Sequence, residues 1–330
     1  MKTGEIRLRE NGRLQYTYIV VILPRSDGEV MGNKFGGEWT EKKLVCVRRY
    51  LDAYATAMKK QAWVTTWYID AFAGCGYVEL QSGQPSLFQE FQDAADASDA
   101  LLVGSALQSL QVMPSFDQYL FIEKSPRHAR SLEDICHGHE HLRHRIQLQQ
   151  GDANELLPRF CNQFRGTNRG VLFLDPFGME IDWTTLQAVA NTEKLDVWYL
   201  VSIDAINRML PRSGEFPDGW EAKLTRYFGT PDWKDVVYQQ PPRKPGLFDA
   251  IEDAETIEVE VVKSTDFQAL KGFVLKQLGR IFRGGVANNP KWLLKYNGTP
   301  LFLLCFAVSN PDPKANSVAL DIAKHILEMP

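Results

Sequence analysis

The chain has 330 residues, of which 44% are hydrophobic and 24% are charged, an ordinary globular composition with enough length for one large domain or two small ones. The formal net charge of -4 argues against a chain that coats nucleic acid or lies on an anionic membrane, although a local basic face can exist within that sum.

Cysteine usage and apolar runs predict a cytoplasmic protein without a membrane anchor. The five cysteines stand singly and form no CxxC pair, which is typical of reduced thiols. The first residues are charged rather than apolar, so no signal peptide is visible. The nearest apolar run, residues 18–23, is far too short to span a bilayer.

Residues 1–38 are predicted to form an N-terminal extension, in which "RLQYTYIVVILP" indicates one strand and the following glycines indicate a loop. The pattern changes at Thr40, after which apolar residues recur at spacings of three and four and predict an amphipathic helix. We expect Thr40 to cap this helix and Lys43 to lie near its outer face.

Short apolar runs then alternate with helical stretches. Strands are predicted at 66–72, 118–123, 146–149, 171–175 and 195–201, and helices at 85–92, 101–111, 129–135, 154–163 and 183–191. This alternation indicates crossover units and a parallel sheet. Near-continuous apolar strands such as "GVLFLD" indicate burial on both faces of that sheet.

The segment from about 203 to 260 breaks the alternation with prolines and aromatic residues. We predict an insertion that packs on the main body, where it either shapes a substrate pocket or serves as a structural lid. A helical pattern at 267–281, a hairpin around Asn297-Gly298 and a closing helix at 316–327 follow. Residues 39–330 are therefore predicted to form one α/β domain, whose mostly parallel sheet ends in an antiparallel hairpin at 291–308.

Four predicted strands carry an acid at or near their carboxyl ends. Asp70 precedes the turn that contains Gly74 and Gly76, and Glu123, Asp152 and Asp175 stand at the ends of later strands. Ligands of open α/β sheets bind beyond the carboxyl ends of the strands, at the point where the strand order reverses. We therefore expect these acids to share one site.

The turn does not fit a dinucleotide or a phosphate site. A Gly-x-Gly-x-x-Gly fingerprint would need glycine where Glu79 stands, and no Gly-x-x-x-x-Gly-Lys-Ser/Thr loop occurs. A ligand without phosphates that needs close backbone contact and several acceptors remains, and S-adenosylmethionine (SAM) is such a ligand. Its amino-acid part can lie on the glycine turn, while its ribose hydroxyls and adenine amine donate to strand-end carboxylates.

The motifs "YIDAFAGCG", "FIEKSP", "GDAN" and "LFLDPFG" resemble the successive motifs of class I SAM-dependent methyltransferases. Together with "WTEKKLVCVRRYLDAYA" and "TPLFLLCFAVSNP", they resemble the bacterial three-Cys-motif partner protein (TcmP) family over residues 39–330. The turn departs from that family by reading Gly-Cys-Gly instead of Gly-Pro-Gly. The resemblance implies a Rossmann-like class I methyltransferase fold, SAM as cofactor and a three-Cys-motif protein as candidate partner.

Each cofactor-site residue has a predicted role and a plainer alternative. Asp70 anchors the turn or the methionine amino group, or caps its own loop amides. Gly74 and Gly76 admit the cofactor to the backbone, or allow tight packing. Glu123 accepts from the ribose, or pairs with Lys124 or Arg127. Asp152 accepts from the adenine amine, or caps a helix. The neighbouring motif residues that complete the predicted cofactor site are Phe72, Ala73, Lys124 and Ala153.

The turn Asp175-Pro176-Phe177-Gly178 is the predicted catalytic element. Enzymes that methylate exocyclic amines carry a similar turn at this strand end, and the resemblance implies that Asp175 and the Pro176 carbonyl accept the amine hydrogens. Phe177 offers a ring on which a base stacks. The alternative is that the turn shapes a pocket floor for another substrate.

The stretch "CHGHEHLRHR" at 136–145 combines Cys136 with several histidines. Its spacing matches no structural zinc pattern, so no metal site is predicted. With its neighbouring arginines it is the most basic stretch of the chain, which makes phosphate contact a candidate role.

We therefore predict methyl transfer from SAM to an amine, with RNA or DNA as the acceptor and a protein acceptor as the alternative. A non-catalytic, methyltransferase-like binding partner of a three-Cys-motif protein is the second alternative. Glu79 disfavours a nucleotide-binding oxidoreductase.

Overall fold

The computed structural model describes residues 38–79, 101–239, 262–263 and 266–330. The predicted strand near residue 20 and the predicted helix at 85–92 lie outside these ranges. The division of the chain at residue 38 therefore stays a prediction.

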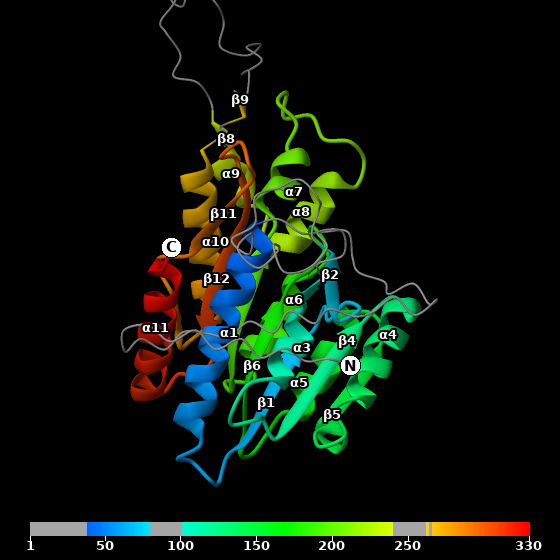
Figure 1. Ribbon diagram of the computed structural model, residues 1–330. Coiled ribbons are helices and arrows are strands. Elements are labelled where there is room, and N and C mark those ends of the chain that lie inside the picture. The colour runs from blue at the N-terminus through cyan, green and yellow to red at the C-terminus, as the bar shows by residue number, and fades with distance from the viewer. Residues whose placement is uncertain (1–37, 80–100, 240–261, 264–265) are drawn as a thin grey trace, which may run out of the picture.

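A mixed, open sheet forms the centre of the molecule (Figure 1). Its strand order is β10-β12-β7-β6-β1-β4-β5, and β11 also pairs with β12. The parallel strands are β1 (Thr65–Asp70), β4 (Gln118–Glu123), β5 (Ile146–Gln150), β6 (Asn168–Leu174) and β7 (Leu195–Val201). The antiparallel strands are β10 (Gly285–Val286), β11 (Lys291–Leu294) and β12 (Pro300–Val308).

This order confirms the predicted Rossmann-like sheet with a C-terminal antiparallel hairpin. The chain runs outward from β1 through β4 to β5, then returns to place β6 on the other side of β1. The strand order therefore reverses between β1 and β6, which is the switch point where such sheets bind ligands. The tight Asn297-Gly298 turn joins β11 to β12, with Gly298 at φ 78°, as its sequence indicates.

Helices cover both faces of the sheet, and the two sets bury separate hydrophobic cores. One face packs against α1 (Glu38–Met58), α3 (Ser105–Leu110), α4 (Pro126–His137) and α11 (Pro313–Glu328). The other packs against α5 (Ala153–Gln163), α6 (Trp183–Ala190), α8 (Trp220–Phe228), α9 (Trp233–Val237) and α10 (Phe267–Ile281).

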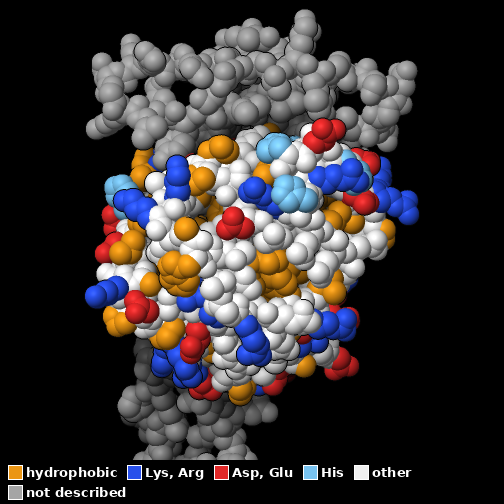
Figure 2. Space-filling model, turned by 90° about the horizontal axis from the view of Figure 1, so that it is seen from below, with side chains coloured by type: hydrophobic (Ala, Val, Ile, Leu, Met, Phe, Trp, Pro, Cys, Tyr) orange, Lys and Arg blue, Asp and Glu red, His pale blue; other side chains and the backbone are white. Residues whose placement is uncertain are grey.

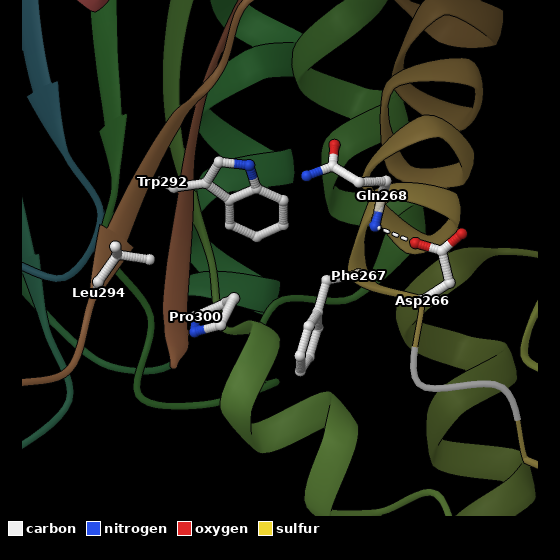
Figure 3. A pocket seen from close by; sticks show the side chains of 6 residues that line it. All are labelled: Asp266, Phe267, Gln268, Trp292, Leu294 and Pro300. Carbon is white, nitrogen blue, oxygen red and sulfur yellow. Dashed lines mark hydrogen bonds between the residues drawn. The ribbon is translucent and has the colours of Figure 1, made fainter. Parts of the chain in front are cut away.

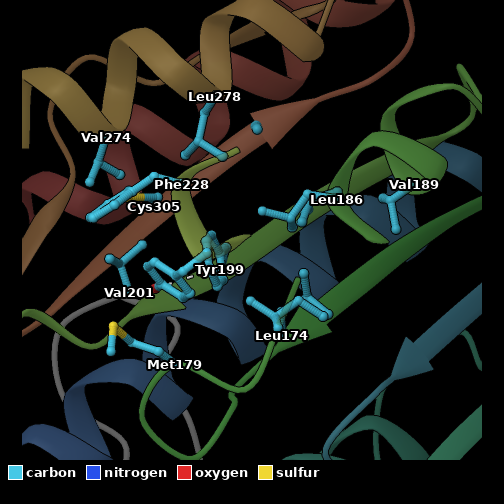
Figure 4. Packing of buried hydrophobic residues seen from close by; sticks show 14 of the residues in the cluster. Leu174, Met179, Leu186, Val189, Tyr199, Val201, Phe228, Val274, Leu278 and Cys305 are labelled. Atoms are coloured by element: carbon cyan, nitrogen blue, oxygen red, sulfur yellow. Dashed lines mark hydrogen bonds between the residues drawn. The ribbon is translucent and has the colours of Figure 1, made fainter. Parts of the chain in front are cut away.

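Alternate residues of each central strand enter opposite cores. In β6, Leu172 and Leu174 join one core, whereas Val171 and Phe173 join the other. Figure 4 shows the first core, where strand residues Leu174, Tyr199 and Val201 lie near helix residues Leu186, Phe228 and Leu278. Burial on both faces explains why these strands are apolar at nearly every position.

The remaining described elements are short: β2 (Tyr77–Glu79), β3 (Leu101–Val103), the 3-10 helix η1 (Arg143–Arg145), α7 (Ile203–Arg208), β8 (Tyr238–Gln239) and β9 (Val262–Lys263). Within the predicted insertion, Tyr227, Phe228 and Trp233 are buried in the same core as α10. The described part of that segment therefore packs on the main body.

Four predicted helix starts are wrong. Two helices begin three residues earlier than predicted, α4 at Pro126 and α11 at Pro313. The helix predicted at 101–111 begins only at Ser105, because residues 101–103 pair with β2 as a strand. Helix α1 begins at Glu38, so Thr40 lies inside the helix instead of capping it, and Thr40 is buried. In α3 and α1 tertiary contacts override the local signal. None of the described helices is long and apolar enough to cross a membrane.

Candidate functional site

Three of the strand-end acids lie at one edge of the sheet, beside the switch point. Asp70 lies in register with Phe121 of β4 and with Phe173 of β6. Glu123 and Asp175 therefore stand two positions beyond Asp70 on the chains to either side. The loop amide of Ala73 donates to the Ile122 carbonyl at 3.0 Å, which ties the glycine turn to the end of β4.

Glu123 accepts two backbone hydrogen bonds that fix the turn. The Gly74 amide donates to Oε2 at 2.8 Å and the Ser125 amide donates to Oε1 at 2.7 Å. The Glu123 side chain is buried, and His128 Nδ1 lies 3.7 Å from Oε1. The alternative of a Glu123–Lys124 pair is wrong, because Lys124 pairs with Asp152. Each carboxylate oxygen of Glu123 keeps a lone pair for a further donor.

The two turn glycines have left-handed backbone conformations, with φ 65° at Gly74 and 90° at Gly76. A Cβ atom on Gly76 would lie 3.0 Å from Ile135 Cδ1, and one on Gly104 would lie 2.9 Å from the Gly76 carbonyl oxygen. Tight packing therefore explains why positions 76 and 104 carry glycine instead of a residue with a side chain. Gly74 instead presents its amide to Glu123.

Asp70 is fully buried and is held by its own surroundings. Ser105 Oγ donates to Oδ2 at 2.6 Å, and the Phe72 amide donates to Oδ1 at 3.2 Å. Burial raises the pKa of Asp70 to about 7, the hydrogen bonds from Ser105 and Phe72 oppose this rise, and the negative charge of Asp175 adds to it. The strand register places Asp70 and Asp175 at the same edge of the sheet. The expected capping of its own loop by Asp70 is also present.

Lys43 is a site residue that the sequence prediction missed. Its ammonium group pairs with Asp175 Oδ2, and only 8% of its side chain is exposed. Its Nζ lies 5.0 Å from the ring centroid of Trp39. The expectation that Lys43 lies on the outer face of α1 is therefore wrong. A signal was present, because Lys43 precedes Val47 by four residues and Tyr50 by seven, which places it on the buried stripe of the helix.

The turn that follows Asp175 presents an aromatic ring at the surface. Pro176 is buried, whereas Phe177 is 51% exposed. Gly178 adopts φ 64°, which allows the chain to reverse there. Asp175 and Phe177 therefore lie on the same turn, the first paired with Lys43 and the second facing outward.

Asp152 caps α5, as the plainer alternative expected. Its Oδ1 accepts from the Asn154 amide at 2.9 Å, and its Oδ2 accepts from Lys124 Nζ at 2.8 Å. The hydrogen bond from Lys124 lowers the pKa of Asp152 below its usual range. Among the other predicted cofactor residues, Phe72 is partly buried against the core and Ala73 and Ala153 are buried. The role of Asp152 in accepting from the adenine amine, and that of the other three residues in the cofactor site, stay predictions.

Asn154 is a second residue that the prediction missed, although it belongs to the quoted "GDAN" motif. Its Nδ2 donates to the Glu180 carbonyl at 2.7 Å, and its Oδ1 accepts from the Asp182 amide at 2.8 Å and from Thr185 Oγ1 at 2.9 Å. Asn154 therefore ties the start of α5 to the loop that leads from Asp175 into α6.

The described surface has two further features that lie apart from these acids. A cavity of about 430 Å³ opens between the start of α10 and β11, and Figure 3 shows Phe267 and Trp292 on opposite sides of it. None of the predicted site residues lines this cavity. The underside of the molecule carries His, Lys and Arg side chains close together (Figure 2), and His137, His141 and His144 are exposed. Within the described residues, no three His, Cys, Asp or Glu side chains are grouped to hold a metal ion.

Comparisons with known proteins give distant structural neighbours. No family model and no curated protein matches the chain. The structure is similar to that of protein LPL1258 from Legionella pneumophila, with 14% identity and a TM-score of 0.48, over 88% of this chain and 93% of that one. It is similar to the N-terminal domain of EvdMO1 with SAH bound, with 12% identity and a TM-score of 0.35, over 78% of this chain and 80% of that one.

A SAM-dependent methyltransferase from Clostridium acetobutylicum is also similar, with 10% identity and a TM-score of 0.32, over 79% of this chain and 91% of that one. The structural neighbours thus include a SAM-dependent methyltransferase. The fold assignment rests on the observed strand order.

Proposed function

We propose that this chain is a SAM-dependent methyltransferase that methylates an amine of a nucleic acid. The observation that supports the proposal is the position of Asp70, Glu123 and Asp175 at the ends of three neighbouring strands beside the Gly74–Gly76 turn, at the edge where the strand order reverses. Open α/β sheets bind their ligands at this edge. The acids supply carboxylate acceptors, and Gly74 in the adjoining turn carries no side chain.

The residues present fit SAM by the chemistry of their donor and acceptor groups. Glu123 keeps lone pairs for the ribose hydroxyls after accepting from Gly74 and Ser125. Asp70 is buried with its pKa at about 7, so a cationic amino group nearby would favour its charged form. When bound, SAM supplies a methyl group that its positive sulfur activates for transfer. The chain itself binds and orients the two reactants, which is the main requirement of an in-line displacement.

Asp175 and Phe177 would hold the acceptor. The carboxylate accepts a hydrogen bond from the acceptor amine, and the exposed Phe177 ring offers a stacking surface to a base. Nucleic acid is favoured as the acceptor class because the Asp-Pro-Phe-Gly turn resembles those of enzymes that methylate exocyclic amines. This support comes from the sequence motif together with the exposure of the ring.

The proposal also includes three features on sequence grounds alone. These are membership of the TcmP family, a three-Cys-motif protein as partner and a cytoplasmic location. A non-catalytic binding role is the second candidate function. Two ion pairs favour it, Asp175 with Lys43 and Asp152 with Lys124. In each pair one carboxylate oxygen of a predicted site residue already has a partner within the protein.

Calorimetry with SAM and with S-adenosylhomocysteine tests the cofactor site. We expect a Kd in the micromolar range or tighter (about −8 kcal/mol or more favourable) and a clear loss of affinity in Glu123→Ala. Glu133→Ala, at an exposed position of α4, is the matched control and should bind as the wild type does. Absence of binding by the wild type, or equal binding by Glu123→Ala, would refute the proposed site.

Transfer of tritiated methyl groups into fractionated cell extract, digested in turn with nuclease and protease, tests the reaction. We expect nuclease-sensitive label with the wild type and none with Asp175→Ala, while Asp175→Ala still binds SAM. Cofactor binding without label in any fraction would favour the non-catalytic role.

A further inference from the structure

The ion pair between Lys43 and Asp175 brings a positive charge to the carboxylate that the proposed function assigns to the acceptor. Lys43 comes from the first turns of α1 and Asp175 from the end of β6, 132 residues further along the chain. The exposed fractions of the two side chains are 8% and 24%. Because Lys43 is nearly excluded from solvent, its charge acts on this site with little screening.

The pair leaves Asp175 able to accept from one more donor. Lys43 contacts Oδ2, and a carboxylate has about two acceptor positions on each of its oxygens. Oδ1 is therefore available to an amine N–H. Trp39, whose ring lies beside the Lys43 ammonium group, comes from the same turns of α1. The start of α1 thus contributes a cation and an aromatic ring next to the Asp-Pro-Phe-Gly turn.

We propose that the start of α1 forms one wall of the acceptor site, where Lys43 is a positioning residue that holds Asp175 and selects a neutral amine over an ammonium ion. This inference rests on the proposed function. The exocyclic amine of a nucleobase is neutral near pH 7, whereas a lysine side chain is an ammonium ion there. Asp175 alone would attract an ammonium ion, but Lys43 offsets that negative charge, so an ammonium ion gains little attraction here and is repelled by the positive sulfur of the cofactor.

The transfer step is consistent with this selection. The acceptor nitrogen must present a lone pair to the methyl carbon, which a neutral amine has and an ammonium ion lacks. The N–C bond forms as the S–C bond breaks, and the electron pair of that bond stays on sulfur. The nitrogen then loses one proton to solvent. Lys43 takes no part in bond making, and its role is to hold Asp175 in the orientation that accepts the N–H of the acceptor.

Acceptor preference is measured first on the wild-type chain, so that this test does not depend on a variant that folds. The probes are total cellular RNA, genomic DNA and poly-L-lysine, each incubated with tritiated SAM at pH 7.5. We expect label in RNA or DNA at a rate about 100-fold or more above that in poly-L-lysine. Label in poly-L-lysine at a rate equal to that in nucleic acid would overturn the inference and leave SAM-dependent methyl transfer in place.

Three variants then test Lys43 itself. Lys43→Met removes the charge at similar length and is expected to lower kcat by about 10-fold or more, with the Kd for SAM changed by less than about 3-fold. Lys43→Arg keeps the charge and is expected to recover most of the rate, which a purely structural role would not predict for a larger side chain. Lys59→Met, the same change at an exposed position directly after α1, is the matched control and should leave the rate unchanged.

The outcomes separate this inference from the proposed function. A Lys43→Met variant that folds and methylates nucleic acid at the wild-type rate overturns the role of Lys43 alone. A wild-type chain that does not bind SAM, or that labels no acceptor, removes the proposed function and this inference with it. If Lys43→Met does not fold, the acceptor preference of the wild type and the methylation rate of Lys43→Arg decide whether Lys43 has the proposed role.

Discussion

Replacing Asp70 with asparagine should make the stability of this protein less sensitive to pH. Asp70 is 0% exposed, and burial raises its pKa from the ordinary value of 3.8 to about 7. The folded protein therefore holds a proton on Asp70 that the unfolded chain releases near pH 4. Because the folded state binds the extra proton between these two values, the free energy of unfolding falls as the pH rises through this interval.

The magnitude follows from the size of the pKa change. One pKa unit corresponds to about 1.36 kcal/mol. Asp70 therefore lowers the free energy of unfolding by about 4 kcal/mol in total between pH 3 and pH 8. About 2.5 kcal/mol of it falls between pH 5 and pH 8. The asparagine side chain of the variant stays neutral at both pH values, so Asp70→Asn should gain about 2.5 kcal/mol relative to the wild type on going from pH 5 to pH 8.

Urea unfolding followed by tryptophan fluorescence at pH 5 and pH 8, at constant ionic strength, measures this difference. Glu133→Gln, which changes an exposed carboxylate on α4, is the control and should keep the pH dependence of the wild type. An Asp70→Asn variant whose unfolding free energy changes with pH as much as that of the wild type would show that Asp70 is already ionised at pH 5 in the folded protein. The reasoning from burial would then be refuted.

Three further predictions concern the same edge of the sheet. The first concerns the pKa of Asp70, which is about 7 in the ligand-free protein. If a cationic group of SAM binds ionised Asp70, the Kd for SAM measured by calorimetry should rise about tenfold for each pH unit below 7. A Kd that stays constant from pH 5.5 to 8 would contradict this. Asn154→Ala removes three hydrogen bonds to the 180–185 segment. It should lower the free energy of unfolding by about 2 kcal/mol and reduce methyl transfer in the extract assay. An unchanged unfolding free energy and an unchanged rate would show that other contacts hold this loop. Gly76→Ala places a Cβ at φ 90° and 3.0 Å from Ile135 Cδ1, and should cost about 1–2 kcal/mol in urea unfolding, whereas a neutral effect would mean that the turn relaxes.

Local patterns in the sequence determined the architecture of the described part of the chain. The alternation of apolar runs and helical periodicity predicted the parallel strands, and the bounds of β4 and β7 match the prediction at both ends. The Asn297-Gly298 pair predicted the closing hairpin. These features depend on residues within a few positions of one another, so they can be read without knowledge of the fold. The order of acids after successive strands likewise predicted that Asp70, Glu123 and Asp175 lie at one edge.

Only the tertiary structure decided which partners these acids have. Asp70 accepts from Ser105, 35 residues away, and Asp175 pairs with Lys43, 132 residues away. Lys43 follows the buried stripe of α1, yet its partner could not be identified from periodicity, because the partner depends on where α1 crosses the end of the sheet. Asp152 could bind a ligand or cap a helix on sequence grounds, and the structure shows the cap. Spacing specifies a face or a strand end, whereas the charge of a site depends on contacts between segments that only folding brings together.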